Sequence, residues 1–135
     1  MRLPMAPPAP LRILVAEDDP SVAQLYCTYA ERRGHRVLVA RDGAEALLIA
    51  ATELPDVVLL DVAMPKLDGR DVIRQLKQSP RTAGIPILVV SALGGEQNMR
   101  AMLLELGAWD VVEKPVDLAV TFGKAERLAE RARSG

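Results

Sequence analysis

The sequence predicts an α/β fold in which a mostly parallel β-sheet lies between layers of helices. Short apolar segments alternate with longer segments of helical periodicity from about Leu11 to the end of the chain. The short segments are hydrophobic at nearly every position, which is typical of strands that are covered on both faces. The length of 135 residues is that of one domain.

Five segments have the length and the β-branched composition of buried strands. They cover residues 11–16, 35–40, 56–61, 85–92 and 109–113. The third is a continuous apolar run that ends in an acid, and the fourth reads IPILVVSA. Because helical segments separate the strands, we expect right-handed crossover connections between parallel strands.

Five further segments carry apolar residues at helical spacing. They cover residues 20–34, 42–54, 68–79, 95–107 and 117–133. The apolar face of the first is predicted to consist of Val22, Leu25, Tyr26, Tyr29 and Ala30. Asp19 followed by Pro20 is a favourable helix start, and Gly34 is a natural stop.

Composition argues against several classes of function. The formal net charge is −1, whereas general affinity for nucleic acid needs a basic surface. No apolar run approaches the roughly 20 residues of a membrane-spanning helix. The single cysteine, Cys27, forms no internal disulfide and fits a reducing cytoplasm. The single histidine, His35, begins a strand after a turn, and we expect it to be solvated.

The chain begins with a Pro-rich stretch that differs from the rest in composition. We expect residues 1–10 to form an extended, mobile lead and residues 11–133 to form the folded domain.

Residues with reactive or charged side chains follow the carboxyl ends of four predicted strands. They are Glu17 and Asp18 after the first strand, Asp61 at the end of the third, Ser91 at the end of the fourth, and Lys114 after the fifth. Binding sites of open parallel sheets lie beyond the carboxyl ends of the strands. These five residues should therefore converge on one edge of the sheet. The second strand ends in ARDG and offers no comparable group.

Three carboxylates in one pocket repel each other unless a cation compensates for their charge. This edge of the sheet offers oxygen ligands and no Cys or His, which disfavours zinc. Mg²⁺ is the leading choice, because it accepts one or two carboxylates together with water and a phosphate oxygen. The alternative is that the acids are helix caps and solvated loop residues. We favour the cap for Asp19 and the metal site for Glu17, Asp18 and Asp61.

Several motifs resemble the response-regulator receiver domain. They are EDD after the first strand, LLDVAMPKLDG around the third, VVSA at the fourth and VVEKPVD at the fifth. The resemblance covers about residues 11–130 and includes Gly34, DG at 42–43 and GA at 107–108. It implies a flavodoxin-like, doubly wound five-stranded parallel sheet of order 2-1-3-4-5, flanked by five helices. It also implies two-component signal transduction by a protein that catalyses its own phosphorylation and dephosphorylation but is not a turnover enzyme.

The resemblance assigns roles to the acidic residues. Asp61 would be the phosphoacceptor, taking a phosphoryl group from a phosphohistidine of a sensor histidine kinase or phosphotransfer protein. Asp18 would bind Mg²⁺ directly, and Glu17 would hold the ion through water. The third protein ligand beside Asp61 would be the backbone carbonyl of Ala63, which places no demand on the side chain.

The resemblance also assigns the switch residues, with one departure. Ser91 would be the switch hydroxyl, and Lys114 would pair with a phosphoryl oxygen, followed by a cis bond to Pro115. Receivers often have Tyr or Phe three residues before this lysine, whereas this chain has Val111, so the aromatic switch cannot operate as usual. Trp109 could provide a different output feature or could be a partly exposed residue at a strand edge.

We expect a single receiver without an attached effector, whose phosphorylation alters a surface within residues 95–125 for a downstream protein target. One alternative is a pseudo-receiver that binds proteins independently of phosphorylation, which Val111 favours. Another is a phosphatase or phosphotransferase of a different α/β family with an Asp nucleophile. Those enzymes often carry a second acid two residues after the nucleophile, and Ala63 holds that position here. A last possibility is a receiver excised from a larger protein.

Overall fold

The computed structural model of the chain describes residues 9–62, 68–92 and 97–134. Its strands are β1 (Arg12–Ala16), β2 (Arg36–Ala40), β3 (Val57–Asp61), β4 (Ile87–Ser91) and β5 (Asp110–Glu113). Its helices are α1 (Pro20–Arg32), α2 (Gly43–Glu53), α3 (Gly69–Gln78), α4 (Gln97–Leu106) and α5 (Leu118–Ser134). Every predicted strand and helix is therefore present, with ends that differ by one or two residues.

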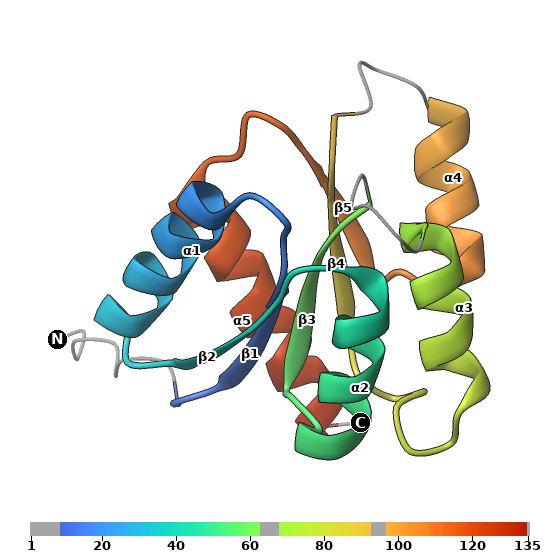
Figure 1. Cartoon of the computed structure of the whole chain (residues 1–135), viewed down its shortest axis with the longest axis horizontal. Helices are drawn as coiled ribbons and strands as arrows, with labels where there is room; N and C mark the ends of the chain where they lie inside the picture. Colours follow the sequence, from blue (N-terminus) through green and yellow to red (C-terminus); the bar gives the residue numbers. More distant parts are fainter. Residues whose placement is uncertain (1–8, 63–67, 93–96, 135) are drawn as a thin grey trace, which may run out of the picture.

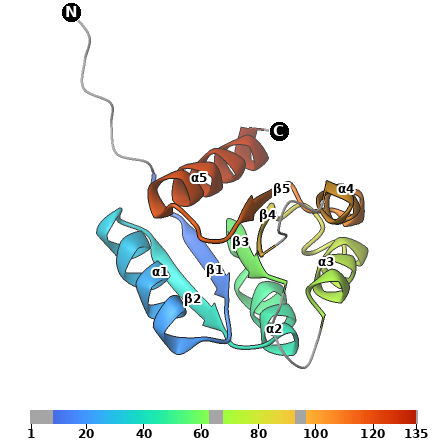
Figure 2. The ribbon, with the colours of Figure 1, turned by 90° about the horizontal axis from the view of Figure 1, so that it is seen from above.

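The strands form one parallel sheet in the order β2-β1-β3-β4-β5, which confirms the fold class. Helices α1 and α5 cover one face of the sheet, and α2, α3 and α4 cover the other (Figures 1 and 2). The register aligns the strand ends: Ala16 pairs with Ala40 on one side and with Leu60 on the other. The residues that follow the strands consequently meet at one edge.

Two aliphatic cores fill the space between the sheet and its helices. Successive residues of β3 alternate between them: Val58 and Leu60 pack toward α2, α3 and α4, whereas Val57 and Leu59 pack toward α1 and α5. Phe122 is the fully buried aromatic ring of the second core. Burial on both faces explains why the strand segments are apolar throughout.

The helix boundaries follow from their capping residues. The Asp19 side chain accepts a hydrogen bond from the Ser21 amide at 2.8 Å, which confirms it as the N-cap of α1. Gly34 has a φ of +91°, a conformation that favours glycine, and it follows the end of that helix. Among the described residues no helix has the length and apolarity needed to cross a membrane.

Some predictions fall on residues that the structure does not describe. The lead at residues 1–10 lies mostly outside the described ranges, so it stays a prediction, as does the domain boundary at 11–133. The predicted start of the fourth helix at residue 95 also lies outside them.

The predicted apolar face of α1 was wrong at one position. Leu25 is 53% exposed, whereas Ala23 is buried together with Tyr26 and Ala30. These three lie at steps of three and four along the helix. Leu25 lies two positions after Ala23 and one before Tyr26, which is off this buried face.

The expectation that His35 is solvated was also wrong. Its side chain is fully buried, and its Nδ1 accepts a hydrogen bond from the Leu11 amide at 3.1 Å. Its Nε2 therefore carries the proton and donates to Glu126 Oε2 at 2.7 Å. Arg33 donates to the same carboxylate. Burial would raise the pKa of Glu126, but the hydrogen bonds from Arg33 and His35 hold it below its ordinary value.

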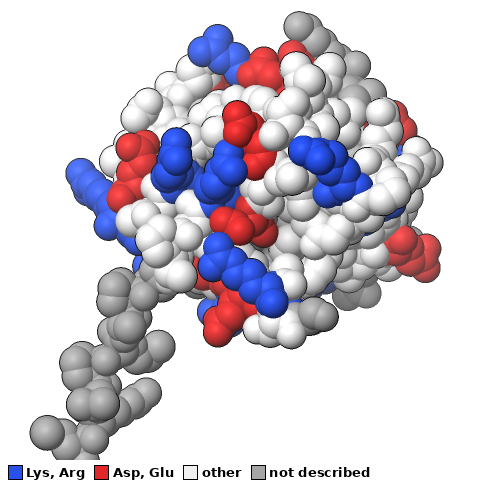
Figure 3. Space-filling model, turned by 90° about the horizontal axis from the view of Figure 1, so that it is seen from below, with Lys and Arg blue, Asp and Glu red and all other residues white. Residues whose placement is uncertain are grey.

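This network joins the first residues of two strands to α1 and α5 at the end of the sheet where the strands begin. The face seen from that end carries acidic and basic side chains side by side (Figure 3). It shows no broad basic field of the kind that nucleic acid binding requires.

We predict that His35→Ala lowers the free energy of unfolding by about 1–3 kcal/mol, because it leaves the buried Leu11 amide without an acceptor. Urea denaturation measures the change. His35→Asn, whose side-chain oxygen can accept from the same amide, should lose less. Equal stability of His35→Ala and the unaltered protein would show that the network contributes nothing.

Candidate functional site

The three predicted acids do converge beyond the ends of β1 and β3. Carboxylate oxygens of Glu17, Asp18 and Asp61 all lie within 4.8 Å of one another. Asp61 is the last residue of β3, and the Glu17 amide continues the β1–β2 ladder by donating to the Ala40 carbonyl at 2.9 Å. Glu17 and Asp61 are buried, whereas Asp18 is exposed. The strand register therefore brings together acids that are 44 residues apart in the sequence.

Glu17 is the electrostatically strained member of the group. Its Oε2 is buried and has no hydrogen-bond partner among the described residues. Burial, followed by the hydrogen bond and the charge of Asp61, raises the pKa of Glu17 to about 8. The ionised form of an acid in this position is stabilised only when a cation binds beside it.

Lys114 supplies one positive charge to the group. Its Nζ lies 2.9 Å from Asp61 Oδ2. Burial would lower the pKa of Lys114, but the hydrogen bond and charge of Asp61 and the charge of Glu17 raise it above its ordinary value. Its backbone amide donates to the Ser91 carbonyl at 3.0 Å, and its bond to Pro115 is cis, as the family resemblance implied.

Ser91 lies at the same edge and is 5% exposed. It is the last residue of β4, and it follows Val90, the residue that pairs with Asp61 in the sheet. On its other side it pairs with Glu113, next to Lys114. The structure thus brings all five predicted residues to one edge. Ala63, the expected carbonyl ligand, lies outside the described residues.

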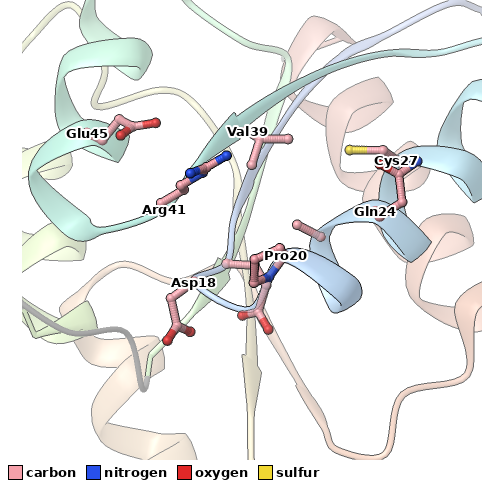
Figure 4. Close-up of a pocket in the computed structure, with 9 residues that line it drawn as sticks. Asp18, Pro20, Gln24, Cys27, Val39, Arg41 and Glu45 are labelled. Atoms are coloured by element: carbon pink, nitrogen blue, oxygen red, sulfur yellow. The ribbon is translucent and has the colours of Figure 1, made fainter.

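Sequence reasoning missed two charged residues of this region, Arg41 and Glu45. A cavity of about 520 Å³ adjoins the acidic group between α1, the end of β2 and the start of α2, and Glu17, Asp18 and Arg41 are among the residues that line it. Figure 4 shows Asp18 and Arg41 at the cavity. The second strand was expected to offer no comparable group, but Arg41 directly follows β2 and so reaches the same edge. Its position after a strand was the available signal.

The residues singled out for output lie near β5. Val111 is 3% exposed and packs in the core on the side of α2, α3 and α4. Trp109 is half-buried just before β5, and Lys77 and Arg131 place their charged groups 5.9 and 5.7 Å from its ring centre. The tryptophan is therefore a packing element between α3 and α5.

The donor set fits a hard divalent cation. All three acids offer carboxylate oxygens, which Mg²⁺ prefers, and the buried Glu17 Oε2 has no hydrogen-bond partner among the described residues. Among the described residues, Lys114 forms an ion pair with Asp61, one of these three acids.

The model of the response regulator receiver domain matches residues 13–125 of this sequence. The chain belongs to this family. It is accordingly a receiver domain and not a turnover enzyme, and it contains an acidic pocket consistent with the Mg²⁺ site of such domains. Receiver domains partner with histidine kinases in two-component systems.

Two curated relatives illustrate the range of proteins that contain such a domain. The response regulator PleD of Caulobacter vibrioides is 40% identical over 117 residues, which are 87% of this chain and 26% of PleD. Protein PilH of Pseudomonas aeruginosa is 37% identical over 106 residues, which are 78% of this chain and 87% of PilH. The receiver thus spans about a quarter of the first relative and most of the second.

Solved receiver structures have the same fold. The receiver domain of the Francisella response regulator 1452 superposes with a TM-score of 0.83 at 31% identity, covering 90% of this chain and 98% of that one. The receiver domain of the sensor histidine kinase PA1611 from Pseudomonas aeruginosa gives a TM-score of 0.81 at 26% identity, covering 90% and 99%. A magnesium ion is coordinated in the active-site cleft of the latter protein.

We predict that, without metal, Glu17→Gln is more stable than the unaltered receiver by a margin that widens from pH 4.5 to about 8. The raised pKa means that the folded protein binds more protons than the unfolded chain in this window, so stability falls as pH rises. Glutamine stays neutral and escapes this loss.

Urea denaturation in a chelator measures the margin. Saturating Mg²⁺ should reverse the order, because the cation stabilises the charged form of Glu17 and glutamine lacks that charge. A margin that does not depend on pH would contradict the raised pKa.

Proposed function

We propose that Asp61 accepts a phosphoryl group from a phosphohistidine of a histidine kinase or phosphotransfer protein. Glu17, Asp18 and Asp61 would hold the Mg²⁺ ion, with the Ala63 carbonyl as a further proposed ligand. The proposal rests on the convergence of three carboxylates within 4.8 Å and on the ion pair between the Lys114 ammonium and Asp61.

The chemistry follows from the arrangement of these side chains. An Asp61 oxygen attacks the phosphorus, the P–N bond breaks, and the histidine nitrogen keeps the electron pair, which leaves an acyl phosphate. The chief obstacle is the approach of a dianionic group to three acids. Lys114 would neutralise part of this charge, and a cation held by the three acids would supply the rest; phosphoryl transfer depends largely on such positioning and neutralisation.

The acyl phosphate would then recruit the switch residues. The Ser91 hydroxyl can donate to a phosphoryl oxygen, and Lys114 can pair with another. Both are joined to the output region: Ser91 ends β4, which α4 follows, and Lys114 follows β5. We place the responding surface within residues 95–125, where a downstream protein would read it through a shift between two arrangements.

A pseudo-receiver that binds proteins without phosphorylation is the second candidate. The buried Val111 favours it, because a small aliphatic side chain cannot reorient as an aromatic switch would.

We predict that acetyl phosphate with Mg²⁺ adds one phosphoryl group to the protein, as measured by intact mass. Asp61→Asn should gain nothing, because the amide is not a nucleophile. Asp56→Asn is the matched control, since Asp56 precedes the other end of β3 and should not affect the gain. The proposal fails if the unaltered protein gains no mass, or if Asp61→Asn gains as much.

We predict that beryllium fluoride, a phosphoryl mimic, shifts backbone amide signals within residues 95–125 when Mg²⁺ is present. The mimic places charge at Asp61, and Ser91 and Lys114 carry the effect outward. Two-dimensional NMR measures the shifts. Shifts confined to the neighbourhood of Asp61 would favour the pseudo-receiver.

A further inference from the structure

Among its described side chains, helix α4 places Leu103 in the core and packs Met99 and Leu106, both partly buried, against it. Of its side chains that the structure describes, Leu103 alone is fully buried. By contrast, α5 buries Thr121, Phe122, Ala125, Leu128 and Ala129. Few buried apolar side chains make an element prone to local displacement. The polar contacts of α4 therefore matter more for its position than those of α5.

Arg100 provides a two-point polar contact from α4 to β5. One of its terminal nitrogens donates to the Val111 carbonyl at 2.8 Å, and the other donates to Asp110 at 3.0 Å. Because β5 is an edge strand, its outward carbonyl has no partner strand to accept from. The guanidinium takes the place of that partner, and its planar fork suits two acceptors at once.

Asp110 also binds α5. Lys124 donates to Asp110 Oδ2 at 3.0 Å, whereas the Val111 amide donates at 2.8 Å to Oδ1, the oxygen that Arg100 also contacts. A single carboxylate thus joins α4, β5 and α5. Burial would raise the pKa of Asp110, but its bonds to Lys124, the Val111 amide and Arg100 hold it below the ordinary value.

The side chain of Val111 cannot be the moving part of this region. It lies in the core at 3% exposure, and its branched side chain has one strongly restricted torsion. What can change is the contact of α4 with the backbone and the acid of β5. That contact depends on Arg100.

We propose that Arg100 is a positioning residue of the switch: its bonds to β5 hold α4 in the arrangement where Lys114 pairs with the Asp61 carboxylate, and phosphorylation favours the arrangement in which they are open. The inference rests on the proposed function and names the contact between Arg100 and β5 as the one that phosphorylation releases. Helix α4 begins six residues after Ser91, so the proposed switch hydroxyl and the helix are neighbours in the sequence.

Linkage makes the proposal measurable. If the Arg100 contact stabilises one arrangement and a phosphoryl mimic favours the other, then removing the contact must tighten binding of the mimic. Removing a positive charge would by itself weaken binding of an anion. Tighter binding therefore cannot arise from the change in net charge.

The experiment compares Arg100→Met with Lys124→Met in the full chain. Each removes one positive charge and one ion pair with the same carboxylate, and each keeps an apolar stem, but only Arg100 holds α4. Calorimetric titration with beryllium fluoride at fixed Mg²⁺ measures affinity. We expect Arg100→Met to bind about 3- to 10-fold tighter than the unaltered protein, and Lys124→Met to stay within about twofold.

Amide hydrogen exchange gives an independent readout. Exchange within residues 97–106 should be faster in metal-free Arg100→Met than in Lys124→Met, with equal thermal unfolding midpoints showing that both variants are folded.

Each remaining outcome overturns the inference. Unchanged or weaker binding by Arg100→Met, or equal tightening by both variants, would show that the contact does not set the switch. If the unaltered protein fails to bind beryllium fluoride with Mg²⁺, the proposed function fails as well. If it binds and only the Arg100 effect is missing, the proposed function stands without this inference.

Discussion

Charge crowding at the edge of the sheet is the constraint on which the site depends. Glu17 and Asp61 are buried side by side, and the exposed Asp18 adds a third acid. Without a cation, a proton on Glu17 reduces the repulsion between the carboxylates, and burial together with the neighbouring Asp61 raises the pKa of Glu17 to about 8. With a cation all three can ionise, and the resulting site can attract a phosphoryl group that three bare acids would repel. The repulsion between the three acids is thus also what makes the site attract a cation.

The fold creates this crowding through register. The pairing of Ala16 with Leu60 brings the residues after β1 beside the end of β3. On the other side of β3, Asp61 pairs with Val90 of β4, so Ser91 lies one position beyond that pair. The N-cap at Asp19 turns the chain into α1 immediately afterwards, so Glu17 and Asp18 remain at the edge. Asp61 could leave this group only through a change in pairing that would also move a core face, because it is itself a paired residue of β3.

Much of this arrangement could be predicted from the sequence, for identifiable reasons. Alternating periods and apolar strands predict a parallel sheet, and the strand ends then predict which side chains meet. What escaped prediction depends on tertiary contacts. Whether Leu25 or Ala23 is buried depends on which face of α1 packs on the sheet, and His35 is buried where Leu11 and Glu126 complete its hydrogen bonds. A single sequence contains no local signal for either.

The two ends of the domain are anchored unequally, and this bears on where a signal can travel. At the end where the strands begin, the buried His35 and the partly buried Glu126 and Arg33 form a network that ties α1 and α5 to the residues before β1 and β2. Helix α4 has one fully buried side chain among those described and partly exposed polar contacts. If Asp61 is phosphorylated as proposed, the added charge would displace α4 more readily than the elements joined by this network. Under that proposal, Val111 in place of an aromatic residue would leave α4 as a route for the signal.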